Sequence, residues 1–135
     1  MTTTPAAPER MTSATFRALR EYLGLPGSWL AAYLEVSERT IRKWDQGESP
    51  IPPGVAEELE HLAQVTTDFV DREAERLRHD PAGTWPFEIP RRVHDLHAMT
   101  PTTDLPIDWW RNVGARLLLA VPGLWLDWID LEDEQ

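Results

Sequence analysis

The sequence contains no cysteine and no long uninterrupted apolar run. Without cysteine, the chain can form neither a disulfide framework nor a thiolate metal site. Its most apolar stretch, residues 117–126, is interrupted by Pro122 and Gly123 and is far shorter than the roughly 18 residues of a membrane span. The first ten residues lack the basic start and apolar core of a signal peptide. These absences predict a cytoplasmic protein with no membrane segment.

Basic residues are outnumbered by acidic ones. The chain has 13 Lys and Arg and 23 Asp and Glu, which give a formal net charge of −10. The cations are also unevenly distributed. Residues 10–43 carry six cations against three acids, residues 44–79 three against nine, and residues 80–135 four against ten. Net acidity argues against indiscriminate nucleic-acid binding, whereas a mildly basic segment in an acidic chain is compatible with a specific contact.

Helical periodicity organises the first part of the chain. Residues 1–11, rich in Thr, Ala and Pro, are predicted to be a disordered arm. Apolar residues at helical spacing then predict four helices, which follow one another along residues 12–79. The first has Ser13 as its cap and Gly24 after its end, the second has Pro26 in its first turn, the third is capped by Ser37 and stopped by Gly47, and the long fourth runs from Pro53 to about Arg78.

The remainder of the chain predicts one more helix and short extended segments. The stretch "WPFEIPRRV" contains two prolines and fits an edge strand or an extended segment. A fifth helix is expected from Asp104 or Pro106, followed after Pro122 and Gly123 by a strand in "LWLDWID". The predicted fold is therefore mainly α, with a helix-turn-helix bundle of four to five helices in residues 12–79 and a small α+β dimerisation region in residues 80–135.

A short helix, a tight turn and a capped helix make the geometry of a helix-turn-helix, whose second helix enters the major groove of DNA. Residues 15–60 resemble the Cro and phage-repressor type of this domain, the XRE class. Ala31 stands where the two motif helices approach closely, Ile41 follows ten residues later, and "VSERTIRKWDQG" matches the usual recognition-helix string. The resemblance implies a sequence-specific, DNA-binding transcriptional regulator without enzymatic activity, most simply a dimeric autorepressor that reads an inverted repeat.

A longer and weaker pattern runs from "WDQGESPIPPGVAEEL" to "WWRNVGARLLLAVPGLWLDWID". It resembles a group of bacterial and phage regulators that includes anti-CRISPR-associated autorepressors, in which a C-terminal segment makes the dimer. Two positions depart from the XRE pattern. Glu35 replaces the usual glycine of the turn, at a cost of about 1 kcal/mol, and the second helix has Pro26-Gly27-Ser28 in place of a polar first turn.

The resemblance assigns base-reading side chains to the start and outer face of the third helix, where Arg39 suits guanine, Glu38 suits cytosine and Lys43 suits guanine or a phosphate. The complete predicted set is Glu38, Arg39, Thr40 and Lys43 for bases, and Arg17, Ser28, Ser37 and Arg42 for phosphates. The alternative is that these cations form the solvated face of an ordinary amphipathic helix.

Tryptophan is concentrated near the C-terminus, since five of the seven residues lie between Trp85 and Trp128. A helix and one or two short strands offer little room to bury so many large side chains in one small chain. We therefore expect a homodimer whose interface includes Trp109, Trp110, Leu117, Trp125 and Trp128. The alternative is that these side chains pack on the long helix.

Other chemistry has little support. His94, Asp95 and His97 lack a second pair of ligands, so no metal site is expected, and neither a Gly-rich phosphate loop nor a Ser-His-Asp set is present. We therefore predict no cofactor and no catalysis. The competing function is an antitoxin-like or other protein-interaction module whose acidic C-terminal half binds a basic protein partner.

Overall fold

The computed structural model describes residues 6–80, 86–92, 95–96 and 104–129. These residues form five helices and two short strands. In chain order, they are α1 (Ser13–Tyr22), α2 (Gly27–Leu34), α3 (Glu38–Gln46), α4 (Pro53–Arg78), β1 (Phe87–Ile89), α5 (Ile107–Ala120) and β2 (Leu126–Trp128). The strands pair in a two-stranded parallel sheet, so the predicted mainly-α fold with a small α+β segment is confirmed.

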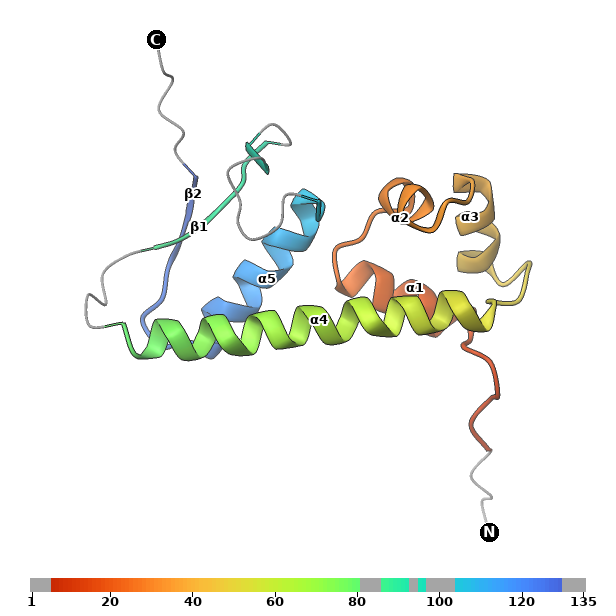
Figure 1. Ribbon diagram of the computed structural model, residues 1–135, viewed down its shortest axis with the longest axis horizontal. Helices are drawn as coiled ribbons and strands as arrows, with labels where there is room; N and C mark the ends of the chain where they lie inside the picture. Colours follow the sequence, from red (N-terminus) through yellow and green to blue (C-terminus); the bar gives the residue numbers. More distant parts are fainter. Residues whose placement is uncertain (1–5, 81–85, 93–94, 97–103, 130–135) are drawn as a thin grey trace.

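Helix α4 runs along most of the molecule (Figure 1). Helices α1, α2 and α3 gather beside its first half, while α5 and the sheet lie beside its second half. Its bounds are those that the apolar spacing predicts. The buried side of α4 includes the side chains of Leu59, Leu62, Phe69, Val70 and Ala74. Val65, which the same spacing places on the apolar stripe, is exposed.

The helix ends show how local sequence fixes these elements. The Ser37 hydroxyl accepts the backbone N–H of Thr40 at 3.1 Å, and Gly47 ends α3 at a φ of 76°, as predicted. Two expected ends are shifted by one residue. The cap of α1 is Thr12, not Ser13, and Pro26 lies at the position just before α2 instead of in its first turn.

The sheet lies against α5. Phe87, Ile89, Leu126 and Trp128 point to one face, because the register pairs Phe87 with Leu126 and Ile89 with Trp128. Gly114 of α5 permits the contact, since a Cβ atom there would be only 3.1 Å from the Ile89 side chain. The expected strand in residues 124–130 is therefore present as β2, and its pairing partner is β1.

The expectation that Trp109, Trp110 and Leu117 face a partner is wrong. Their side chains are almost completely buried within the chain, at exposures of 2%, 1% and 0%. Trp109 and Trp110 pack on Phe69 of α4, with ring centroids 5.5 and 5.7 Å apart, and the indole N–H of Trp109 donates to the Thr66 hydroxyl at 2.9 Å. The length of α4 supplies the apolar surface that the short C-terminal elements lack.

One hydrophobic cluster continues from Phe16 in α1 to Val121 after α5. The described part of the C-terminal region therefore packs onto the same core as the first three helices. No helix among the described residues is long and apolar enough to cross a membrane.

Candidate nucleic-acid interface

The turn between α2 and α3 depends on a left-handed residue. Glu35 has a φ of 58° and is the one non-glycine residue with a positive φ in the described ranges. In this conformation the Glu35 N–H bonds to the Ala32 carbonyl at 3.2 Å, and the Val36 N–H bonds to the Ala31 carbonyl at 2.9 Å. The two bonds satisfy the last carbonyls of α2, so the chain reverses within two residues and enters α3.

Helix α3 is attached to the core by its inner face. Ile41 and Trp44 are buried, and the Trp44 ring makes an edge-on contact with Phe16, at a centroid distance of 5.8 Å. Next to them, the guanidinium of Arg20 donates to both carboxylate oxygens of Asp45, at 3.3 and 2.7 Å. A third bond from Arg20, 3.0 Å long, ends on the carbonyl of Leu25. The single side chain of Arg20 thus ties α1 to α3 and to the segment that precedes α2.

The predicted base-reading residues share the outer side of α3 with Arg42, which is predicted to contact a phosphate. Glu38, Arg39 and Arg42 are exposed, and Thr40 and Lys43 are half-exposed. In the part of the chain that the structure describes, none of the three cations Arg39, Arg42 and Lys43 forms an ion pair. Three positive groups therefore extend from one rigid helix into solvent.

The predicted phosphate-contacting residues lie in different local settings. Ser28 is exposed in the first turn of α2, a helix whose N-terminus has no side-chain cap. Arg17 is exposed on α1, where its guanidinium is 3.7 Å from the Glu21 carboxylate in a solvated pair that contributes little. Ser37 accepts the α3 capping bond, and its hydroxyl oxygen is also 2.9 Å from that of Thr40.

Two aromatic side chains of α2 were not among the predicted site residues. Trp29 and Tyr33 of α2 stack at a centroid distance of 5.0 Å, and the Trp29 indole N–H donates to the Asp104 carbonyl at 2.9 Å. The Tyr33 hydroxyl donates to the Glu58 carboxylate of α4 at 2.6 Å. This hydrogen bond to Glu58 raises the pKa of Tyr33 to about 12. Their helical spacing alone indicated only an apolar face.

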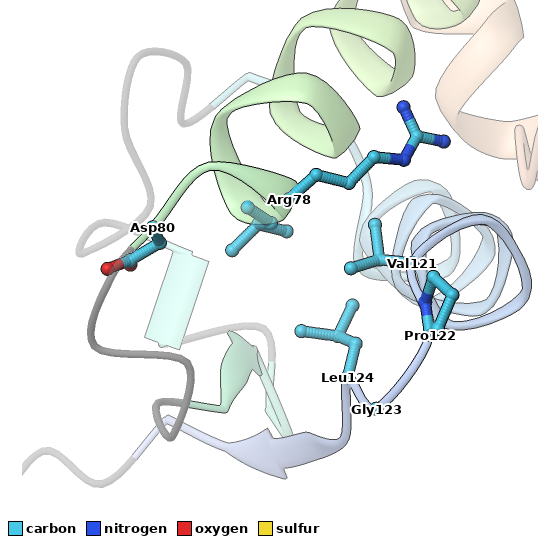
Figure 2. A pocket seen from close by; sticks show the side chains of 7 residues that line it. Arg78, Asp80, Val121, Pro122, Gly123 and Leu124 are labelled. Carbon is cyan, nitrogen blue, oxygen red and sulfur yellow. The ribbon is translucent and has the colours of Figure 1, made fainter.

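A separate hollow lies where α4 and α5 end, far from α3 (Figures 1 and 2). Leu77, Val121 and Leu124 line its inside, while the guanidinium of Arg78 extends away and donates to the Ala120 carbonyl at 3.0 Å. Its volume of about 240 Å³ is below the range of about 300–1,000 Å³ for small-molecule sites. The side chains around it include no nucleophile paired with a base.

Some predicted features fall outside the described residues. These are His94 and His97 of the weak metal hypothesis, Trp85, and the first five residues of the predicted arm. Asp95 is described: its buried carboxylate accepts hydrogen bonds from the Arg92 backbone at 3.1 Å and from the Arg92 guanidinium at 3.2 Å. Within the described ranges, no group of three His, Asp or Glu side chains is placed to hold a metal ion.

No protein-family model matches the sequence, and no curated protein is significantly similar to it. Function is therefore inferred from the geometry of α2, α3 and the side chains that surround them.

Proposed function

We propose that the protein is a sequence-specific, DNA-binding transcriptional regulator of the helix-turn-helix type, in which α3 is the recognition helix. The observation that carries the proposal is the contrast between the two sides of α3. Its inner side is fixed by Ile41, Trp44 and the Arg20–Asp45 pair, while its outer side presents cations without intramolecular partners in the described ranges. A rigid helix with unpaired cations is suited to the major groove, because no internal salt bridge has to break first.

Each outer side chain has a role that fits its chemistry. Arg39 can donate two parallel hydrogen bonds to guanine O6 and N7, and Glu38 can accept from cytosine N4. Thr40 and Lys43 complete the base-reading set, with Arg17, Ser28, Ser37 and Arg42 directed to the phosphate backbone. The acidic remainder of the chain repels DNA of any sequence, so stable binding depends on the contacts of α3, which favours specificity over affinity.

The proposed active form is a homodimer that represses transcription from an inverted repeat. A two-fold axis would place two copies of α3 about 34 Å apart, one helical turn of DNA. Trp125 and Trp128 remain candidates for the interface, because they are 48% and 38% exposed, unlike the buried tryptophans of α5. Leu119, which is 89% exposed, joins them as a large apolar side chain with no cover in the monomer.

The test is selection of bound sequences from a random duplex library, combined with measurement of the mass of the protein in solution. We expect an enriched inverted repeat with half-site centres about 10 base pairs apart, together with a dimeric mass. A library that shows no enrichment would overturn the proposal and favour the competing function, in which the acidic C-terminal half binds a basic protein.

A further inference from the structure

The backbone that leads into α5 lies directly against the start of the helix-turn-helix. The Trp29 indole N–H donates to the carbonyl of Asp104 at 2.9 Å. Gly24, in the turn between α1 and α2, has a φ of 71°, and a Cβ atom there would lie 2.3 Å from the carbonyl oxygen of Asp108. No residue other than glycine fits such an approach of two backbones. The segment 104–108 is thus packed against the loop and first turn of α2.

Helix α2 packs on the core by its inner face, where Leu30 is 1% exposed. It has eight residues, of which Leu30 and Ala31 are buried, and no side chain caps its N-terminus. Its exposed flank is held by a chain of three contacts: the Asp104 carbonyl to Trp29, the Trp29 ring to the Tyr33 ring, and the Tyr33 hydroxyl to Glu58 of α4. Trp29 is the one member of this chain that joins α2 to the segment before α5.

We propose that Trp29 is a positioning residue for DNA binding. Its indole N–H holds the first turn of α2, and with it Ser28, in the orientation in which α2 and α3 approach the DNA together. The inference rests on the proposed function, because it assigns the role of Trp29 to the same interface. Residues 12–79 then bind DNA with full affinity only while the segment before α5 is docked on them, so the two parts of the chain are coupled.

The variant Trp29→Phe separates the two roles of the side chain. Phenylalanine keeps a ring to stack on Tyr33 but has no N–H to donate to Asp104. The matched control is Trp109→Phe, which removes a second indole hydrogen bond, the 2.9 Å bond to Thr66 between α4 and α5. If Trp109→Phe does not fold, Thr66→Val serves as the control instead, because it removes the same hydrogen bond.

The 135-residue chain and its variants are titrated with the selected operator at a temperature at which circular dichroism shows each of them to be folded. We expect Trp29→Phe to weaken operator binding at least about fivefold, the lower end of typical coupling between sites. The slope of log Kd against log salt should not change, because a phosphate contact from the uncharged Ser28 displaces no counterion. The control should leave Kd and the slope unchanged, even where it lowers Tm. A purely structural role of Trp29 would lower Tm alone.

The outcomes separate the two proposals. If the wild-type chain enriches no duplex, the proposed function is overturned, and the inference with it. If the wild-type chain binds its operator and Trp29→Phe binds equally well, or if the control loses as much affinity, the inference alone is overturned. Hydrogen exchange of the free protein adds a test without DNA. The Leu30 amide, which donates to the Pro26 carbonyl at 2.9 Å across the first turn of α2, should exchange faster in Trp29→Phe, and unchanged exchange would refute positioning by Trp29.

Discussion

Arg20 and Asp45 form a two-point ion pair between α1 and α3, with 90% of the Arg20 side chain and 88% of the Asp45 side chain removed from solvent. Removal of one member of a buried pair leaves the other charge without a partner, which costs about 3–5 kcal/mol. We expect Asp45→Ala to lower the free energy of unfolding by about 3 kcal/mol, the lower end of this range because some solvent remains. Urea unfolding measures the change.

The exposed pair of Arg17 and Glu21 provides the control for this prediction. Its members are 3.7 Å apart, and each side chain is more than half exposed. Glu21→Ala should therefore change stability by less than about 1 kcal/mol. Equal losses in Asp45→Ala and Glu21→Ala would show that the Arg20–Asp45 pair is as weak as a surface pair.

Glu35 is the strained residue of the helix-turn-helix turn. An L-residue with a side chain pays about 1 kcal/mol for the left-handed conformation, which glycine adopts freely. Glu35→Gly should relieve this strain of about 1 kcal/mol. Glycine has more conformational entropy in the unfolded chain, which offsets part of the gain, so we expect the free energy of unfolding to rise by less than about 1 kcal/mol. Glu35→Ala removes the same carboxylate but keeps the strain, so it should give no gain. A similar gain in both variants would attribute the effect to the charge and not to the backbone.

Local signals made much of the first half of the fold predictable. The Ser37 cap, the Gly47 stop and the apolar stripe of α4 each depend on residues within a few positions of one another, and each lies where the sequence indicated, except that Val65 of the stripe is exposed. The left-handed turn at Glu35 followed from the resemblance to a known motif and is present. Its presence supports the motif geometry.

Contacts between distant residues were not predictable in the same way. Whether Trp109 faces a partner or Phe69 depends on the packing of α5 along α4, and no periodicity within either helix encodes that choice. Arg20 appeared in the sequence as one more cation of the basic segment, yet its charge is used by Asp45, 25 positions away. An acid next to the buried Trp44 is the signal that could have indicated this internal partner.

The salt dependence of binding tests whether the basic segment contacts the DNA backbone. A dimer that engages about six to eight phosphates should lose roughly 10³-fold or more in affinity between 50 and 200 mM salt. Binding releases counterions from the DNA, and this release is less favourable at a higher salt concentration. Fluorescence anisotropy of a labelled operator gives the affinity at each salt concentration. A nearly flat response would mean that the cations of α1 and α3 do not contact phosphates.

The double variant Arg39→Ala with Lys43→Ala tests the assigned reading face. Loss of a good base contact costs about 1–3 kcal/mol. The double variant removes two contacts from each protomer of the dimer, so it should weaken operator binding at least about 10³-fold. Both side chains point outward, and the unfolding free energy should stay within about 0.5 kcal/mol of that of the wild type.

A variant with the same change in charge serves as its control. Arg72→Ala with Arg76→Ala removes two positive charges from exposed positions on α4, outside the proposed interface. If this control weakens operator binding as strongly as the first variant, net charge, and not base recognition by α3, controls the affinity.

Lys43 is the only lysine in the chain, which allows a chemical footprint of a single side chain. Amine acylation of the free protein should modify Lys43 and the terminal amine, and it removes the positive charge of the lysine. If Lys43 lies in the major groove, saturating operator should slow its acylation severalfold and leave the terminal amine, the internal control, unaffected. Protein acylated beforehand at Lys43 should bind the operator more weakly. Mass spectrometry of peptides at successive reaction times gives both rates, and equal acylation of Lys43 with and without operator would place this side chain outside the DNA contact.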